Sequence, residues 1–595
     1  MKPENYVPHL HNTNYQEEFE AKPILADSLL STEGREMLSL NGPWRFTVDP
    51  YDTCLRARWF EERGVDESGR KLPLDYDFDA WQTIQVPSCW NLASDRLFHY
   101  EGPAVYTRTF DYQLKDSGRV FLYCQGISYR ATVFLNARFL GLHRGASTPF
   151  CVEVTELLQE KNRLLIVVDN TRREDQVPMS NTDWFNYGGI YRRVSLVKAP
   201  RSFIRDFSLR LVKNSNFSRI EAEVATCEDP GGKEQNPEQA VVEIPELDVR
   251  IGISIKDGRG SVTFSAQPKL WSPEQPRLYT VKVHYRKDSI SDRVGFREIR
   301  VEGGNILLNG RPYFLKGVSC HEESLTNGKS LTPEEIRQNF SLAKELNCNF
   351  MRLAHYPHAA ESARIADEVG ILLWEEIPVY WDIQFNNPKT YADAENQLSE
   401  LILRDKNRAS VVIWSVGNEN ADTDARLGFM RRLADKARRL DPDRLVSAAC
   451  LVNKTLNRIQ DRLTQHLDLI GVNEYYGWYD PDFSKLVQLF ENSRPDKPVI
   501  ITEFGAAALK GKRGEESQLF SEDCQKKIYE RQTETLKAID YVKGMSPWIL
   551  YDFRCPRRRN SYQQGYNRKG LLSEDKQYRK PAFWVLKRFY ESDSN

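Results

Sequence analysis

The stretch SVVIWSVGNEN, residues 410–420, is a continuous apolar run that ends abruptly on Asn418 and Glu419. Residues 411–414 do not alternate between apolar and polar types, so the strand that they predict is buried on both faces. Parallel strands covered by helices have this pattern. A carboxylate at the end of such a strand is costly to bury unless it has a function. The plain alternative is a strand that ends in a solvent-exposed loop.

The size and composition of the chain predict a multidomain protein with large cores. Its 595 residues are 40% hydrophobic and 11% aromatic, and domains of ordinary size would number about three. The formal net charge is −1, so the composition does not favour nucleic acid or an anionic membrane surface as a partner. No apolar window is long enough to suggest a membrane span.

The cysteines and the first residues of the chain bear on the cellular compartment in which the protein is expected. The ten cysteines are scattered, with no CxxC pair and no zinc-like spacing, so we expect buried free thiols in a reducing environment. Residues 1–22 lack the apolar core of a signal peptide. We expect a cytoplasmic protein, although an export signal removed before expression would leave the same start.

Two β-sandwich domains are predicted before residue 303. Residues 1–200 contain short strand patterns such as 118–128, 131–141 (with a turn at 136–138) and 163–170, and their spacing predicts a jelly-roll β-sandwich. Residues 201–302 continue with strand patterns whose size and number fit an immunoglobulin-like β-sandwich, although the Cys–Trp–Cys signature of that fold is missing.

Residues 303–595 alternate apolar strands with amphipathic helices. One helix start is explicit, because Thr332 at the N-cap, Pro333 in the first turn and Glu335 form a capping box. Strands separated by helices in this way predict a (β/α)₈ TIM barrel. The strand candidates are 313–315, 349–353, 371–374, 411–414, 445–448, 469–472, 499–501 and 545–550.

The carboxyl ends of these strands hold the functional candidates, since active sites of such barrels lie there. Two carboxylates facing each other could serve as general acid/base and nucleophile at an acetal centre. The residues alone do not decide which carboxylates form the pair; the candidates are Glu322, Glu375, Glu376, Glu419, Glu474 and Glu503. The same strand ends also supply Arg352, His355 and aromatic side chains.

Two long segments resemble the signatures of glycoside hydrolase family 2. RDKNRASVVIWSVGNE (404–419) resembles the acid/base signature, and NFMRLAHYPHAAESARIADEVGILLWEE (349–376) resembles the other. The domain order also fits the family over essentially the whole chain. The resemblance implies a retaining glycosidase with Glu419 as acid/base, Asn418 near the sugar 2-hydroxyl, and Glu503 in VIITEFG as nucleophile.

The same resemblance implies that no cofactor and no metal takes part. The general mechanism needs neither. His355 and His358 are interpreted as barrel packing, because no third ligand of suitable spacing follows them.

The segment SYQQGYNRKGLLS (561–573) bears on the substrate. It resembles the Asn-x-Lys motif of β-glucuronidases, at Asn567 and Lys569, and a sugar carboxylate needs a cation and a hydrogen-bond donor. The alternative is a basic surface loop, because residues 554–569 are broadly cationic. Further residues match sugar-contacting positions of the same enzymes: Asp183, His321, Asn473, Tyr475, Tyr479 and Trp548.

The resemblance therefore implies an exo-acting hydrolase of terminal β-D-glucuronides that forms a homo-oligomer and has no nucleic-acid or membrane partner. A β-galacturonidase or β-galactosidase of the same family is the alternative, and a catalytically inactive carbohydrate-binding protein is the alternative from another class. The short connection from residue 382 to the helix at 391 predicts an open site for oligosaccharide ends or bulky aglycones.

Overall fold

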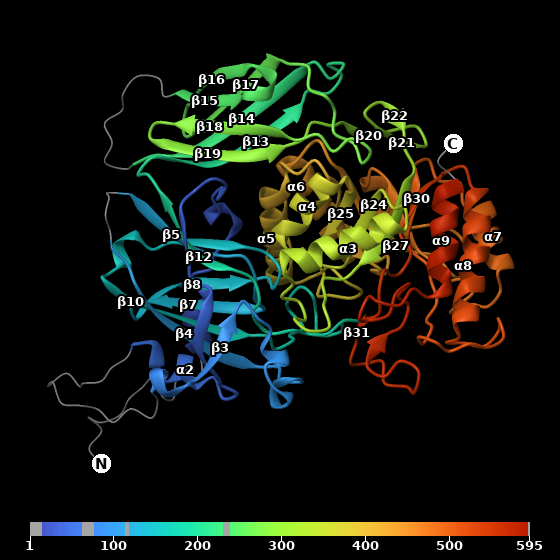
Figure 1. Ribbon diagram of the computed structural model, residues 1–595, viewed down its shortest axis with the longest axis horizontal. Helices are drawn as coiled ribbons and strands as arrows, with labels where there is room; N and C mark the ends of the chain where they lie inside the picture. The colour runs from blue at the N-terminus through green and yellow to red at the C-terminus, as the bar shows by residue number, and fades with distance from the viewer. Residues whose placement is uncertain (1–14, 62–76, 114–117, 230–238, 593–595) are drawn as a thin grey trace.

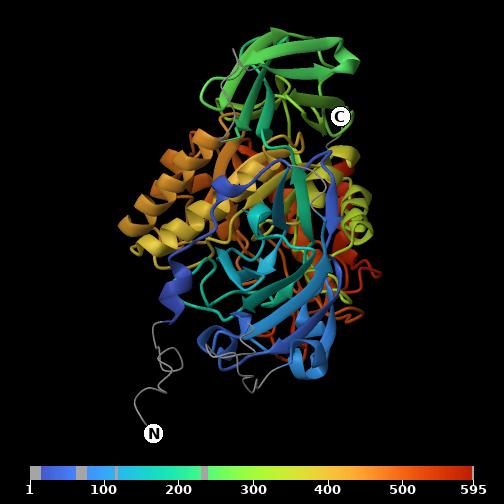
Figure 2. The same ribbon diagram turned by 90° about the vertical axis from the view of Figure 1, so that its left-hand side faces the viewer.

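The computed structural model describes residues 15–61, 77–113, 118–229 and 239–592. Two sandwich domains and a barrel are distinguishable in the ribbon (Figure 1). Turned by 90°, the N-terminal sandwich lies in front of the barrel and the second sandwich lies above both (Figure 2). This architecture confirms the predicted fold class. The domain division at residues 1–200, 201–302 and 303–595 stays a prediction.

The N-terminal domain packs two antiparallel sheets face to face around buried aromatic residues such as Trp44, Trp90 and Tyr106. Asn136 and Ala137 adopt φ of 48° and 62°, as a two-residue hairpin turn requires. One sheet contains β1 (Met37–Ser39), β12 (Val194–Ala199), β5 (Arg119–Cys124) and β9 (Phe150–Glu153). The other contains β3 (Gln82–Val86), β2 (Gly42–Val48), β4 (Pro103–Asp111), β10 (Lys161–Asp169), β7 (Arg130–Leu135) and β8 (Arg138–Arg144), beside the pair β6 (Ile127–Ser128) and β11 (Gly189–Ile190) and helices α1 (Tyr15–Glu20) and α2 (Thr53–Arg56).

The second domain is a smaller antiparallel sandwich whose strands alternate buried and partly exposed residues, as β14 does. Its first sheet contains β13 (Phe203–Leu211), β14 (Arg219–Cys227) and β17 (Arg259–Ser265). Its second sheet contains β16 (Val249–Ser254), β15 (Gln239–Ile244), β18 (Tyr279–Tyr285) and β19 (Asp288–Val294). A short sheet of β20 (Ile299–Glu302), β21 (Asn305–Leu308) and β22 (Arg311–Pro312) leads into the barrel.

The third domain is a closed parallel barrel, and every residue of its strand β26 is buried. The predicted capping box is present at the start of α3. The barrel strands are β23 (Leu315–Cys320), β24 (Phe350–Leu353), β25 (Leu372–Glu376), β26 (Val411–Asn418), β27 (Leu445–Leu451), β28 (Ile470–Asn473), β29 (Val499–Glu503) and β30 (Val542–Met545). The α-helices are α3 (Pro333–Glu345), α4 (Ala360–Val369), α5 (Pro388–Asp405), α6 (Asp424–Leu440), α7 (Ser484–Asn492), α8 (Glu522–Lys537) and α9 (Pro581–Ser592), and the pair β31 (Phe553–Arg554) and β32 (Tyr566–Asn567) follows β30.

Two barrel strands lie away from their predicted positions. The first was predicted at 313–315, but β23 starts at Leu315 and includes Lys316, whose ammonium donates to the carbonyl of Tyr590. The eighth was predicted at 545–550, but β30 ends at Met545. Residues 546–550 are buried as a rim loop, with Ile549 and Leu550 inside the core, and apolar character alone does not separate such a loop from a strand.

Buried polar contacts fix the N-terminal sandwich on barrel helix α5. The Tyr129 hydroxyl donates to Asp393 at 2.5 Å, and a ring nitrogen of His143 lies 3.0 Å from Glu400. This docking brings the segment between β10 and β11, which carries Asp183, to the barrel mouth.

The second sandwich is joined to the barrel by the buried guanidinium of Arg408. It pairs with Asp292 of β19 and lies 3.4 Å from Asp367 of α4. Burial alone would raise the pKa of Asp292, but Arg408 and Arg364 lower it below its ordinary value. The ion pair therefore compensates charges that are costly to bury.

We expect Arg408→Met to lower the free energy of unfolding by about 3 kcal/mol or more, because buried Asp367 and Asp292 both lose the cation that they share, although Asp292 keeps its contact with Arg364. Arg431→Met is the matched control, since this arginine is 60% exposed in α6 and an exposed ion pair contributes about 1 kcal/mol at most. Calorimetric unfolding should show a lower midpoint for Arg408→Met alone. Equal midpoints for both variants would contradict this account.

Candidate active site

A cavity of about 660 Å³ opens at the carboxyl ends of the barrel strands and is closed on one side by Asp183 of the N-terminal sandwich. Of the predicted site residues, it is lined by Asp183, Glu419, Asn473, Tyr475, Tyr479, Glu503, Trp548, Asn567 and Lys569. His321 and Asn418 lie behind this wall, where they contact residues that line it.

Glu419 follows the last residue of β26 and adopts φ of 54°, while its N–H donates to the carbonyl of Ala449 at 2.8 Å. Its carboxyl accepts hydrogen bonds from Trp381 Nε1 at 2.7 Å and from Asn473 Nδ2 at 3.0 Å. Burial, and then the negative charge of Glu503, raise the pKa of Glu419 to about 7. The carboxyl is thus about half protonated at pH 7 and largely protonated below it.

Glu503 ends β29 and has a different environment. One carboxylate oxygen accepts from Arg352 Nη1 at 2.7 Å, and the other accepts from the Tyr475 hydroxyl at 2.7 Å. A cation therefore contacts Glu503, whereas the donors to Glu419 are neutral. Two carboxyl groups in such unequal surroundings suit the roles of nucleophile and acid.

Arg352 of β24 connects the strand ends. It is fully buried and donates to Glu376 at 2.9 and 3.1 Å, to Glu503, and to Asn418 Oδ1 at 2.7 Å. Burial alone would raise the pKa of Glu376, but Arg352 lowers it to about 2. Glu376 is therefore a permanent counter-ion of Arg352.

The amides of Asn418 and Asn473 have fixed orientations. Asn418 Oδ1 accepts from Arg352 and from Asn473 Nδ2, the latter at 3.2 Å. Asn473 Oδ1 accepts from the Thr502 hydroxyl at 2.6 Å, so Asn473 Nδ2 faces Asn418 and Glu419. The amide network orders the end of β26 beside the cavity.

Lys569 lies at another side of the cavity and is 2% exposed. Its ammonium donates to the Tyr479 hydroxyl at 2.9 Å and lies 4.9–5.9 Å from the ring centroids of Tyr475, Trp478 and Tyr479. Although burial opposes the shift, Lys569 lowers the pKa of Tyr479 below its usual value. Asn567 Oδ1 accepts from the backbone N–H of Lys569 at 3.1 Å.

Asp183 reaches this side of the cavity from the N-terminal sandwich. It accepts from Asn567 Nδ2 at 3.1 Å and pairs with Arg558 at 2.5 Å. Arg558 also lines the cavity. Asn567 is thereby held between Asp183 and the Lys569 backbone.

Aromatic rings close the floor of the cavity. The Trp548 ring stacks on His355 with centroids 4.8 Å apart, and His355 Nδ1 lies 2.8 Å from Glu376. His321 contacts Trp548 edge-on at 5.2 Å, and burial lowers its pKa well below the ordinary value. A neutral His321 therefore supports Trp548 from behind.

Other carboxylates among the candidates are accounted for. Glu322 pairs with Arg192 at 2.6 Å, and Glu375 does not line the cavity. Glu474 does line it, but it accepts from the Tyr476 backbone and from Gln532, and burial raises its pKa to about 8. Among the described residues, no group of three potential ligands that could hold a metal ion is present.

Sequence reasoning left Trp381, Tyr380 and Arg558 out of the predicted site, although they line the cavity. These residues come from loops after β25 and β31. Arg352 and Glu376 were recognised as strand-end residues but were not assigned to the site. Their only signal was charge at the end of an apolar strand.

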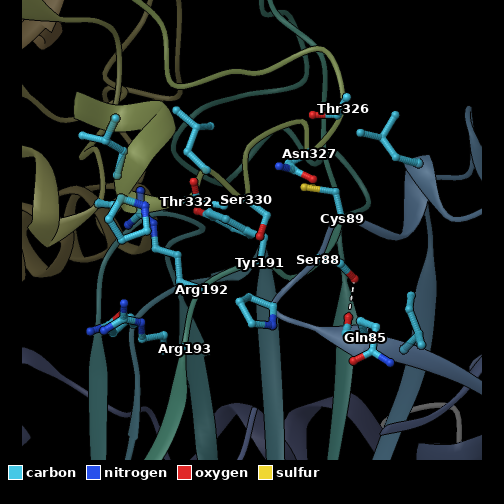
Figure 3. Close-up of a pocket in the computed structure, with 18 of the residues that line it drawn as sticks. Gln85, Ser88, Cys89, Tyr191, Arg192, Arg193, Thr326, Asn327, Ser330 and Thr332 are labelled. Atoms are coloured by element: carbon cyan, nitrogen blue, oxygen red, sulfur yellow. Dashed lines mark hydrogen bonds between the residues drawn. The ribbon is translucent and has the colours of Figure 1, made fainter. Parts of the chain in front are cut away.

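A separate cavity of about 550 Å³ lies between the N-terminal sandwich and the loop before α3 (Figure 3). Tyr191, Arg192 and Cys89 line it from the sandwich, and Asn327 and Thr332 line it from the barrel (Figure 3). It contains none of the predicted site residues, so it is distinct from the cavity with the paired carboxyl groups.

Known proteins match the chain over nearly its full length. The family models "Glycosyl hydrolases family 2, sugar binding domain", "Glycosyl hydrolases family 2" and "Glycosyl hydrolases family 2, TIM barrel domain" match residues 37–200, 202–297 and 299–593. A β-glucuronidase from Paenibacillus borealis is 30% identical over 94% of this chain and 97% of that protein. The β-glucuronidase of Homo sapiens is 27% identical over 94% of this chain and 91% of that protein.

Solved structures agree with this match. A family 2 β-galacturonidase from Eisenbergiella tayi bound to galacturonate has a TM-score of 0.82 and 27% identity, covering 95% of this chain and 99% of that chain. A β-glucuronidase from Ruminococcus gnavus in complex with D-glucuronic acid has a TM-score of 0.82 and 25% identity, covering 95% and 100%.

A barrel with paired carboxyl groups at its mouth, preceded by two sandwiches, defines this protein as a glycoside hydrolase. The chain belongs to glycoside hydrolase family 2. Within the described ranges, no helix has the length and apolar character needed to cross a membrane.

Proposed function

We propose that this protein is a retaining, exo-acting β-glucuronidase that releases terminal β-D-glucuronate. Glu419 is the acid/base, Glu503 is the nucleophile, and Lys569 with Asn567 binds the sugar carboxylate. The two relatives named above are β-glucuronidases that align along most of this chain. This similarity supports the assignment of glucuronate as the sugar that is released.

The observation that carries the proposal is the isolation of Lys569. It is buried in the cavity wall, and in the part of the chain that the structure describes no carboxylate pairs with its ammonium. A buried cation without an anion is costly. The carboxylate of a uronic acid would supply the missing charge, and Asn567 Nδ2, which donates one of its two hydrogens to Asp183, would donate the other to this carboxylate.

The first chemical step forms a glycosyl-enzyme ester. A Glu503 carboxylate oxygen attacks the anomeric carbon and the bond to the leaving oxygen breaks, while Glu419 transfers its proton to that oxygen. A pKa of about 7 keeps this proton available near neutral pH. Arg352 and Tyr475 hold Glu503 from both oxygens, so its attack needs little reorientation.

The second step returns the enzyme to its starting state. Water attacks the anomeric carbon and gives its proton to Glu419, which is now ionised, and the ester bond to Glu503 breaks. The product keeps the configuration of the substrate. No metal or cofactor takes part in either step.

The alternative sugar is β-D-galacturonide, which presents the same carboxylate and differs at the C4 hydroxyl. The structural similarity to the Eisenbergiella tayi enzyme supports keeping it as the second candidate. Asp183 and Arg558 lie beside Asn567, so we propose that this pair contacts the C4 hydroxyl, at which the two sugars differ.

We further propose, from the family resemblance, a homo-oligomeric enzyme of a reducing compartment such as the cytoplasm. The described cysteines are all free thiols, which supports the compartment. Sedimentation velocity tests the assembly state, and a monomer at micromolar concentration would contradict it.

We expect Glu503→Gln to lower kcat for an aryl β-D-glucuronide by at least about 10⁴-fold, because the attacking oxygen is lost. Binding of glucuronate, measured by calorimetry, should persist. Glu474→Gln is the matched control, since Glu474 also lines the cavity and its raised pKa of about 8 makes it neutral at pH 7. Full turnover by Glu503→Gln would favour another nucleophile, and no turnover by the wild type would favour a carbohydrate-binding protein.

We expect Lys569→Met to reduce kcat/KM for the aryl β-D-glucuronide by about 10²-fold, since a charge-assisted hydrogen bond is lost, and to leave the aryl β-D-galactoside unaffected. Lys485→Met is the control, because Lys485 also lines the cavity but pairs with Asp480 at 2.7 Å. A galacturonide preference lost in Lys569→Met would keep the carboxylate site and change the sugar. Unchanged uronide hydrolysis would refute the assignment.

A further inference from the structure

The segment between β25 and α5 places Trp381 against the end of β26. The Trp381 N–H donates to the carbonyl of Asn418 at 2.9 Å, and the Trp381 carbonyl accepts from Asn420 Nδ2 at 2.6 Å. The backbone of Trp381 is therefore tied to the residues on both sides of Glu419.

Trp381 adopts φ of 54°, as Glu419 does. This left-handed conformation is uncommon for bulky side chains, and it persists only where the surroundings fix it. Here it turns the indole so that Nε1 donates to Glu419 Oε2 at 2.7 Å.

The other side of the indole is covered by a cation. The guanidinium of Arg557 lies 5.1 Å from the ring centroid. Arg557 also donates to Asn181 Oδ1 at 3.0 Å and lies 3.9 Å from Asp183. A contact from the N-terminal sandwich thus reaches Glu419 through Arg557 and the indole.

The two donors to Glu419 constrain where its proton resides. Trp381 Nε1 and Asn473 Nδ2 can only donate, and each occupies one lone pair of the carboxyl group. A proton on Glu419 must then use one of the remaining lone pairs of this carboxyl group, which lines the cavity. Both donors also stabilise the ionised carboxylate, which is the form that deprotonates water in the second step.

We propose that Trp381, supported by Arg557, is a positioning residue that sets the orientation and protonation of the acid/base Glu419. This inference rests on the proposed roles of Glu419 and Glu503. The proposed role of Trp381 differs from substrate binding, because Trp381 acts through Glu419 on the leaving group and on the attacking water.

Other charged or titratable groups also face Glu419. They are Glu503 from β29, Arg352 from β24, Tyr475 after β28 and Tyr380 after β25. Trp381→Phe leaves all of them in place and removes the indole N–H. Arg557→Met leaves the N–H and removes the cation, and since Arg557 is 48% exposed this variant should fold normally.

The test compares the pH dependence of kcat/KM for an alkyl β-D-glucuronide, whose leaving group needs a proton. The wild-type rate should fall as the pH rises through about 7, where Glu419 loses its proton. Removing a donor to the ionised form raises the pKa of Glu419. Trp381→Phe should therefore move the falling limb upward by about half a pH unit or more, and Arg557→Met should move it less, in the same direction.

We expect kcat of Trp381→Phe for the alkyl glucuronide to fall by about 10- to 100-fold, because a misplaced acid/base loses efficiency, with little change in KM. Formation of the glycosyl-enzyme from a dinitrophenyl β-D-glucuronide, whose leaving group departs without a proton, should be nearly unaffected. Trp584→Phe in α9 is the matched control, since Trp584 is 42% exposed. It should change neither quantity.

A pH profile and leaving-group dependence of Trp381→Phe identical to those of the wild type would overturn the inference, as would an equal loss with both substrates. Glu419→Gln separates this failure from failure of the proposed function. If Glu419→Gln loses alkyl glucuronide hydrolysis while Trp381→Phe does not, only the inference is wrong. If Glu419→Gln is fully active, the assignment of the acid/base itself is wrong.

Discussion

The buried guanidinium of Arg352 is the interaction on which the site depends. It is fully inaccessible to solvent and contacts Glu376, Asn418 and Glu503 from three other strands of the barrel. A buried cation with this many donors needs acceptors on several sides, so it fixes the positions of the strand ends. Glu376 compensates its charge, and Glu503 adds a further negative charge that faces the cavity. An oxocarbenium-like transition state carries the opposite charge.

The two central carboxyl groups differ because of this arrangement. The Glu503 carboxylate accepts from the cationic Arg352, whereas the Glu419 carboxyl accepts from the neutral donors Trp381 and Asn473. Burial and the charge of Glu503 raise the pKa of Glu419 to about 7. One barrel mouth thus provides both an acid and a carboxylate. The sandwich domains take part indirectly, since α5 docks the sandwich that delivers Asp183 and supports Arg557.

The barrel could be predicted from the sequence because residues 411–414 are continuously apolar and α3 starts with a complete capping box. The two sandwiches could be predicted from the spacing of the short strands before residue 303. The residues alone could not choose Glu419 and Glu503 among the carboxylates; that choice came from the family resemblance and remains a proposal. Trp381 and Asp183 reach the cavity through loops whose paths no periodicity encodes. The sequence alone does not show which cation of residues 554–569 could bind a substrate carboxylate, because it does not show which of them form ion pairs. In the folded chain Arg558 pairs with Asp183 and Arg568 pairs with Glu574, whereas among the described residues no carboxylate pairs with Lys569.

The central claim is that Glu503 forms a covalent bond with the anomeric carbon of a uronic acid. Mass spectrometry of the enzyme incubated with 2-deoxy-2-fluoro-β-D-glucuronyl fluoride tests it directly, because the fluorine slows hydrolysis of the ester more than its formation. The account predicts one fluoroglucuronyl group per chain, located by peptide sequencing on Glu503. A label on Glu419 or Glu376, or turnover of the wild type with inversion and no covalent species, would contradict it.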